Sequence, residues 1–358
     1  MINKILQKSK FTKDDIVFLL NAKDDDEKKL FLRSAEIKEK HVGNKVWLRG
    51  LIELSNICSK NCYYCGIRKG NKNVCRYEIQ LDEVIESAKF ALDNGFGSIV
   101  IQSGEIQSTK FTNKILDILQ KIQQLSSPKL RVTLSCGEQT EETYRKWFDA
   151  GAERYLLRIE TSNSDLYHKI HPNDSLHDFD KRIEALNVLK KIGFQTGTGV
   201  MIGLPFQTID DLANDILFMQ KMDIHMCGMG PYIEHSETPL FKYSSLLLSL
   251  RERYELALKM IAVLRIVMKD INIASTTAFQ TIDSEGKKSA LEIGANVLMP
   301  NLTPAKYKEN YNLYNNKPGK ENTISYEFNL AFEMIRNAEN IVRLNEYGDS
   351  IHYSTKKE

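Results

Sequence analysis

The chain has little of several features that define common protein classes. It contains 49 Lys and Arg against 47 Asp and Glu, and this net charge of +2 gives no electrostatic reason to expect nucleic acid or an anionic membrane as a partner. No apolar run approaches the ~20 residues of a membrane span, and the Lys-rich N-terminus lacks the apolar core of a signal peptide. Six cysteines in 358 residues do not make a disulfide scaffold, which favours a reducing cytoplasm. We therefore expect a cytoplasmic protein that acts on a small molecule.

Three of the cysteines lie together in one short motif. Cys58, Cys62 and Cys65 read CxxxCxxC and directly follow an extended apolar stretch, where a strand passes into a loop. Thiolates are the usual ligands of iron–sulfur clusters, and a [4Fe-4S] cluster needs a ligand on each of its four irons. Three cysteines leave one iron open, which is typical of a catalytic rather than a structural metal site. The simpler alternatives are unrelated buried thiols or a zinc site, but zinc normally needs a fourth ligand, and Cys75 lies beyond a charged loop.

Strand and helix patterns alternate along the chain. Eight apolar runs are predicted to be strands, with helical spacing of apolar residues between them. The runs are Val46–Leu54, Ser98–Gln102, Leu130–Ser135, Arg154–Ile159, Thr196–Ile202, His225–Met229, Ile273–Thr277 and Ala295–Met299. Near-continuous apolar strands with helical connections indicate parallel strands that are covered on both faces. The predicted fold is α/β, a complete TIM-type (βα)8 barrel.

One barrel with two extensions accounts for the length of the chain. Residues 1–45 are predicted to form an N-terminal helical extension that covers the lower end of the barrel. Residues 46–304 form the predicted barrel, and residues 305–358 form a C-terminal extension that closes or flanks it. The chemistry of such barrels lies at the carboxyl ends of the strands, which is where the cysteine motif follows the first strand.

Small and polar residues end the next strands. Gln102, Ser103, Gly104 and Glu105 end the second strand, where glycine lets the backbone approach a ligand and Glu105 offers an acceptor to an ammonium group. The same four residues also fit an ordinary polar turn. The third and fourth strands supply further polar groups. Arg182 begins the helix before the fifth strand, although such a helical arginine is more often solvated. These strand ends suit a nucleoside joined to an amino-acid zwitterion.

The open iron and the polar strand ends resemble the radical S-adenosylmethionine (SAM) superfamily, in which the amine and carboxylate of SAM complete the cluster. Motifs spread over residues 46–314 resemble, more narrowly, the HydE family of [FeFe]-hydrogenase maturases. They are Leu51–Cys58, Gln102–Glu105, Arg154–Thr161, Gly203–Pro205, Gly228–Tyr232 and Gly294–Asn301.

This resemblance implies two sets of site residues. The first set would hold SAM beside a single [4Fe-4S] cluster and consists of Thr133, Glu160 and Arg182. The second would line the internal cavity and consists of Arg154, Arg158, Thr276, Thr277, Met299, Tyr311 and Tyr314. Two arginines inside a barrel would be costly unless they met anions, so an anionic substrate is expected. Arg154 equally fits a solvated strand start, and the two tyrosines fit a packed aromatic pair.

The resemblance also implies an activity. Members reductively cleave SAM to a 5′-deoxyadenosyl radical and act on an iron–carbonyl–cyanide–cysteine complex during assembly of the hydrogenase diiron centre. Such work implies transient contacts with the other maturases and with an electron donor. Some relatives carry a second cluster on further cysteines, but none follows Cys227 here, so one cluster is expected.

Three alternatives remain open. A biotin-synthase-like sulfur insertion is disfavoured, because only Cys136 offers a further ligand on the strands concerned. A methylornithine-synthase-like mutase would bind an amino acid instead of a metal complex. A non-catalytic iron–sulfur carrier or scaffold would have four protein ligands on its cluster. It would have no reason for the polar residues at the strand ends.

Overall fold

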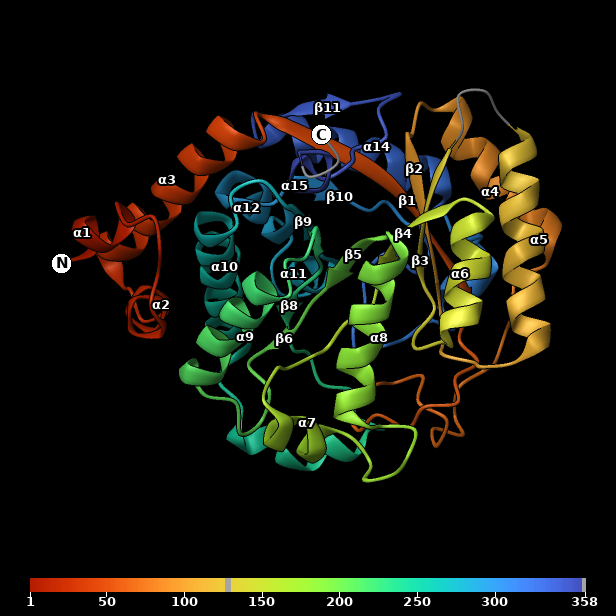
Figure 1. Cartoon of the computed structure of the whole chain (residues 1–358), viewed down its shortest axis with the longest axis horizontal. Helices are drawn as coiled ribbons and strands as arrows, with labels where there is room; N and C mark the ends of the chain where they lie inside the picture. The colour runs from red at the N-terminus through yellow and green to blue at the C-terminus, as the bar shows by residue number, and fades with distance from the viewer. Residues whose placement is uncertain (126–129, 356–358) are drawn as a thin grey trace.

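Eight parallel strands close into a barrel in the computed structural model, which describes residues 1–125 and 130–355 (Figure 1). The barrel strands are β1 (Lys45–Ser55), β2 (Ser98–Ser103), β3 (Arg131–Ser135), β4 (Ala152–Leu156), β5 (Gln195–Thr198), β7 (Met226–Cys227), β9 (Asn272–Ser275) and β10 (Val297–Leu298). Pairing of Trp47 with Val297 joins the first strand to the last and closes the sheet. The TIM-type barrel predicted from the apolar runs is confirmed, because every run contributes a strand at its predicted place in the order.

Two predicted strands are each divided in the structure. The run at 196–202 forms β5 and then β6 (Met201–Ile202), and the run at 225–229 forms only β7, followed by β8 (Gly230–Pro231). β6 and β8 pair with each other in a small sheet of their own. The division falls where the two backbones come very close, since a Cβ on Gly199 would lie 1.9 Å from the Gly228 carbonyl oxygen.

Amphipathic helices surround the barrel. They are α4 (Leu81–Asp93), α5 (Thr109–Leu125), α6 (Glu141–Asp149), α8 (Phe179–Ile192), α9 (Ile209–Lys221), α10 (Leu250–Val267), α11 (Thr277–Ile282) and α12 (Gly286–Ile293). Capping boxes fix the starts of α9 and α10, where Thr208 and Ser249 exchange hydrogen bonds with the acidic residue three positions later. At the carboxyl end of the barrel lie α7 (Ser164–Ile170) and the 3-10 helix η1 (Pro239–Leu246), at the bottom of Figure 1.

The N-terminal extension lies on the flank of the barrel. It consists of α1 (Ile2–Leu6), α2 (Lys13–Leu20) and α3 (Asp24–His41). The second helix packs on α9 and the third on α10, and the Lys38 ammonium of α3 donates to the Leu291 carbonyl oxygen at 2.6 Å. The prediction that this extension covers the lower end of the barrel is therefore wrong.

The C-terminal extension closes the lower, amino end instead. It contains α13 (Ala305–Lys308), α14 (Ile324–Asn337), β11 (Ile341–Arg343) and α15 (Ile351–Ser354). The strand β11 pairs with residues 45–47 of β1, and residues 347–350 then cross the end of the barrel. Side chains from four barrel strands bind this crossing segment, namely Arg49, Arg154, Gln195 and Asn272. Within the described residues, no helix is long and apolar enough to span a membrane.

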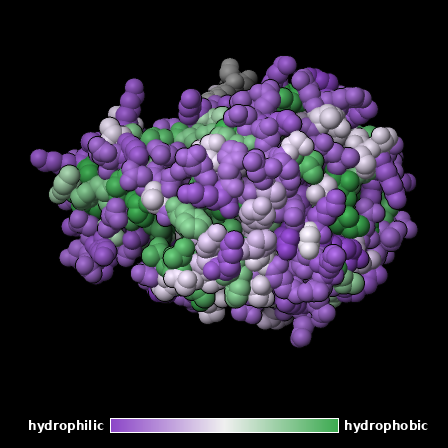
Figure 2. Space-filling model, turned by 90° about the horizontal axis from the view of Figure 1, so that it is seen from below, coloured by the Kyte–Doolittle hydropathy of each residue, from purple (hydrophilic) through white to green (hydrophobic). Residues whose placement is uncertain are grey.

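The carboxyl end of the barrel faces the viewer in Figure 2, which shows a largely hydrophilic surface interrupted by hydrophobic patches. Among the exposed apolar side chains at this end are Phe241 and Leu246 of η1. The cysteine loop predicted from the sequence lies at this end of the barrel.

Candidate functional site

The three cysteines of the motif lie on the loop that follows β1, at the carboxyl end of the barrel. Cys62 is buried, whereas Cys58 and Cys65 are half-buried. Burial raises the pKa of Cys62 to about 12, and the neighbouring Cys58 adds to this effect. Burial also raises the pKa of Cys65, and both other thiols contribute. The backbone N–H of Cys65 donates to the Cys62 carbonyl oxygen at 3.3 Å, so the last two cysteines of the motif lie in one turn of the loop.

One arginine, which the sequence analysis missed, organises the backbone of this loop. The guanidinium of Arg76 donates to the carbonyl oxygens of Asn56, Ile67 and Arg68, each at 2.7 Å, and to that of Asn71 at 3.0 Å. A single planar group therefore joins Asn56, two residues before the first cysteine, to residues after the last.

The end of β2 supports the loop from the side. A Cβ on Gly104 would lie 2.2 Å from the Ile57 carbonyl oxygen, so only glycine fits beside the loop. The next backbone N–H, of Glu105, donates to the Cys58 sulfur at 3.3 Å. The close approach predicted for Gly104 is thus made to the cysteine loop itself. Ser103 is half-buried, and its hydroxyl donates to the Gly104 carbonyl oxygen at 2.7 Å.

A buried quartet of two cations and two carboxylates adjoins the loop. The Lys60 ammonium lies 3.0 Å from oxygens of both Glu105 and Glu138. Arg182 lies 2.7 Å from Glu138 and 3.6 Å from Glu105. The four charges sum to zero, which explains how they remain buried. Arg182 is therefore not a solvated helix arginine, which was the alternative interpretation. Its partner Glu138 and the second cation Lys60 were missed because these contacts join residues that are far apart in the sequence.

Arg158 and Glu160, which follow β4, form a second ion pair. The guanidinium donates to both carboxylate oxygens of Glu160 at 2.8 Å, and also to the Val200 carbonyl oxygen at 3.0 Å. Glu160 adopts a left-handed backbone with φ of 66°, an uncommon conformation for a side-chain-bearing residue. A residue predicted for the substrate and one predicted for SAM thus bind each other.

Arg154 lies apart from this group. Its side chain is fully buried, and its guanidinium lies 2.5 Å from Asp349 and donates to the Tyr347 carbonyl oxygen at 2.6 Å. The anion expected beside this arginine is supplied by the C-terminal extension at the amino end of the barrel. Nor is Arg154 solvated at the strand start, as the alternative held.

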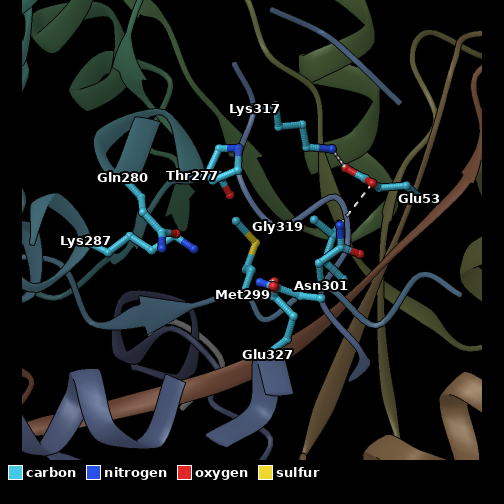
Figure 3. A pocket seen from close by; sticks show the side chains of 12 residues that line it. Glu53, Thr277, Gln280, Lys287, Met299, Asn301, Lys317, Gly319 and Glu327 are labelled. Carbon is cyan, nitrogen blue, oxygen red and sulfur yellow. Dashed lines mark hydrogen bonds and ion pairs between the residues drawn. The ribbon is translucent and has the colours of Figure 1, made fainter. Parts of the chain in front are cut away.

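Three of the remaining predicted residues border two cavities inside the barrel. The lower cavity is lined by Thr133, Met226 and Cys227 among others, and Met299 borders both cavities. The upper cavity includes Thr277 and is shown in Figure 3. Within the described residues the Thr133 hydroxyl is buried without a hydrogen-bond partner, which is a group that a ligand can satisfy.

Three further predicted residues lie around the mouth. The Thr276 hydroxyl donates to the Met229 carbonyl oxygen at 3.2 Å. Gln102 donates to the Tyr311 hydroxyl at 3.1 Å, and the Lys317 ammonium lies 5.0 Å from the centre of the Tyr311 ring. Burial raises the pKa of the neighbouring, half-buried Tyr314. The Gly66 N–H donates to the Leu313 carbonyl oxygen at 2.9 Å, so the segment with both tyrosines rests on the cysteine loop.

The donor set fits a [4Fe-4S] cluster with SAM. Among the described residues, no group of three His, Cys, Asp or Glu side chains converges on a point suited to a single metal ion. A cubane cluster needs no such convergence, because each thiolate binds a different iron. The guanidinium of Arg182 partly offsets the burial that raises the pKa of Cys62. The unpartnered Thr133 hydroxyl and the cation at Arg182 suit the hydroxyl and carboxylate groups of SAM.

Comparisons with known proteins agree with this geometry. Residues 52–219 match the family model for the radical SAM superfamily. The chain is 43% identical to the [FeFe] hydrogenase maturase subunit HydE of Thermotoga maritima, over 88% of this chain and 86% of that protein. It is 25% identical to the 3-methylornithine synthase of Methanosarcina barkeri, over 84% of this chain and 83% of that protein.

Two solved structures share the fold. Methylornithine synthase (PylB) has a TM-score of 0.72 at 22% identity, covering 83% of this chain and 85% of that chain. HydG, a maturase of the [FeFe]-hydrogenase, has a TM-score of 0.77 at 20% identity, covering 97% of this chain and 76% of that chain. At these identities the likeness shows the architecture alone.

Proposed function

Because the chain belongs to the radical SAM superfamily and, within it, to the family of the [FeFe] hydrogenase maturase HydE, we propose that it cleaves SAM reductively and transforms an iron–carbonyl–cyanide–cysteine complex. The product contributes to the diiron centre of the hydrogenase. The protein is thus a radical SAM enzyme, and its partners are the other maturases and an electron donor.

The observation that carries the proposal is the position of three grouped thiols above an enclosed lumen. Cys58, Cys62 and Cys65 would hold the [4Fe-4S] cluster, and such a cluster would supply the electron for the reductive cleavage of SAM. Thr133, Glu160, Arg182 and the backbone and side chains of Gln102–Glu105 bind SAM. The barrel wall keeps water from the reaction because its lumen is closed at the amino end by residues 347–350.

The cavity residues orient the substrate. Arg158 offers a cation whose charge Glu160 balances when no substrate is present. An anionic group of the substrate can accept hydrogen bonds from the same guanidinium. Thr276, Thr277, Met299, Tyr311 and Tyr314 shape the remaining wall. Arg154 takes a different role from the one implied by the resemblance, because it fixes the floor of the barrel through Asp349.

The test is anaerobic reconstitution followed by incubation with SAM, dithionite and a synthetic iron–carbonyl–cyanide–cysteine complex. We expect 5′-deoxyadenosine together with a product that depends on the complex. Formation of 5′-deoxyadenosine with L-lysine and conversion of the lysine would instead support a mutase, and absence of 5′-deoxyadenosine would leave only a carrier or scaffold.

Two cysteine variants on one loop supply a matched comparison. Cys65→Ala removes a cluster ligand, so we expect the bound iron and the 5′-deoxyadenosine to fall to background. Cys75→Ala removes an exposed thiol from the same loop and is expected to keep both. Iron analysis and product chromatography measure the two quantities, and equal loss in both variants contradicts the assignment of the ligands.

A further inference from the structure

The chain from the end of α7 to the start of α8, residues 170–177, contacts the cysteine loop at the carboxyl end of the barrel (Figure 1). The Lys60 ammonium donates to the Leu176 carbonyl oxygen. The Tyr63 N–H donates to the Ile170 carbonyl oxygen at 3.0 Å. Two further contacts come from histidines of the same segment, and neither the cysteine motif nor the proposed chemistry uses them.

His177 accepts a hydrogen bond from the backbone of the loop. Its Nε2 atom lies 2.9 Å from the nitrogen of Asn61, the residue before Cys62. Its other ring nitrogen, Nδ1, lies 2.6 Å from the Asp174 carboxylate and donates to it, so Nε2 is left as the acceptor. Burial lowers the pKa of His177, although Asp174 opposes this effect, so the imidazole is neutral at pH 7.

His171 accepts a hydrogen bond from a side chain inside the motif. Its Nδ1 atom lies 2.9 Å from the Tyr167 carbonyl oxygen, so Nδ1 carries the hydrogen and Nε2 is the acceptor. The Tyr64 hydroxyl lies 3.2 Å from Nε2 and is the donor. The imidazole stacks on the Tyr167 ring, with the ring centres 3.9 Å apart. Burial lowers the pKa of His171 well below its usual range, which keeps the ring neutral.

The Tyr64 hydroxyl has a single hydrogen to donate and two acceptors for it. Cys62 is the competing acceptor, because a hydrogen bond from Tyr64 opposes the burial that raises the pKa of its thiol. Hydrogen bonds to the sulfurs of an iron–sulfur cluster stabilise its more negative, reduced form and so raise its reduction potential. A hydrogen that Tyr64 donates to His171 is not available to Cys62.

We propose that His171 and His177 are positioning residues for the cluster. His177 fixes the backbone of the loop at Asn61, and His171 directs the Tyr64 hydroxyl away from the sulfur of Cys62, which keeps the reduction potential of the cluster low. A low potential favours transfer of an electron from the cluster to SAM. This inference rests on the proposed function, because it requires the [4Fe-4S] cluster on the three cysteines.

The test of His171 is a redox titration of the anaerobically reconstituted protein without SAM, followed by electron paramagnetic resonance. His171→Phe keeps a ring that can stack on Tyr167 but removes the acceptor. We expect the released Tyr64 hydroxyl to donate to the Cys62 sulfur. The ratio of reduced to oxidised cluster at a fixed applied potential should then rise about fivefold, the effect of one ordinary hydrogen bond.

Tyr64→Phe supplies the matched control. Alone it should leave the potential unchanged, because the hydroxyl that it removes is bound to His171 in the wild type. Combined with His171→Phe, it should abolish the rise, since no hydroxyl is left to donate. A potential that does not rise in His171→Phe, or a rise that persists in the double variant, overturns the role of His171.

The test of His177 is the rate at which the reconstituted protein loses iron to a chelator. His177→Leu removes the acceptor of the Asn61 N–H and should speed the loss several-fold. His177→Gln places an amide oxygen near the position of Nε2 and should restore the wild-type rate. His168→Leu changes an exposed histidine of α7 and should have no effect. Equal rates in His177→Leu and His168→Leu overturn the role of His177, and if His177→Leu does not fold, the His171 variants still decide.

Failure of this inference is distinguishable from failure of the proposed function. Formation of 5′-deoxyadenosine by the wild type reports on the proposed function alone. If the wild type cleaves SAM while the histidine variants keep its potential and its rate of iron loss, only the positioning role is overturned. A wild type that assembles no [4Fe-4S] cluster overturns both.

Discussion

At the scale of single residues, side chains outside the cysteine motif hold the motif in place. Arg76 binds four backbone carbonyl oxygens, and Gly104 lets the end of β2 touch the loop. The cysteines themselves were predictable because their spacing is local. Arg76, Lys60 and Glu138 were not, since nothing in the sequence pattern shows which distant atoms they meet.

Arg76→Gln is expected to loosen the loop. Glutamine cannot span four carbonyl oxygens, and leaving them without a charged donor costs on the order of 3 kcal/mol. We expect the iron content after reconstitution to fall several-fold. Lys72→Gln, an exposed change in the same loop, is the control and should leave the iron content unchanged. Equal iron in both variants would show that the loop does not need this arginine.

Asp215 gives the stability a dependence on pH. Its carboxylate on α9 accepts from the Ser162 N–H and hydroxyl, both at 2.6 Å, just beyond Glu160. Burial raises the pKa of Asp215 from 3.8 to about 7, despite these hydrogen bonds. Between these two values the folded state binds more protons than the unfolded state, so stability falls as the pH rises through this range.

Asp215→Asn is expected to remove this slope, because an amide does not titrate. The difference in unfolding free energy between the variant and the wild type should therefore favour the variant more at pH 8 than at pH 5. Urea unfolding at the two pH values measures the difference. Asp210→Asn, on the exposed side of α9, should keep the wild-type slope. If the unfolding free energy of both variants depends on pH in the same way, groups other than Asp215 cause the dependence.

At the scale of elements, the crossing segment at residues 347–350 acts as part of the barrel. It carries no apolar periodicity, so the sequence indicated only an extension that closes or flanks the barrel. The contacts that define it join residues far apart in the chain, such as Arg154 and Asp349. The eight barrel strands, in contrast, were predicted because each is a continuous apolar run, and only the breaks at Gly199 and Gly228 were missed.

Asp349→Asn is expected to destabilise the protein by roughly 3 kcal/mol, because it leaves the buried Arg154 without a counter-charge. The double variant Arg154→Met with Asp349→Asn should lose less than the single variant, since it removes both charges together. Chemical denaturation gives the unfolding free energies. Additive losses would mean that the two residues do not interact.

At the scale of the whole molecule, the two extensions contact different parts of the barrel. The N-terminal helices brace α9 and α10 on the flank, while the C-terminal extension contacts both ends of the barrel. The sequence predicted two extensions, but the amphipathic pattern of a helix does not say which surface it meets. The lower end was therefore assigned to the wrong extension.

The late position of the crossing segment also matters for biosynthesis. Arg154 precedes Asp349 by 195 residues, and every barrel strand is translated before the residues that seal its floor. In a nascent chain, arginines that are buried in the folded protein therefore have no counter-ion yet. The amino end of the barrel stays hydrated until that counter-ion is made. Closure of the lumen becomes one of the last events of folding on or after the ribosome.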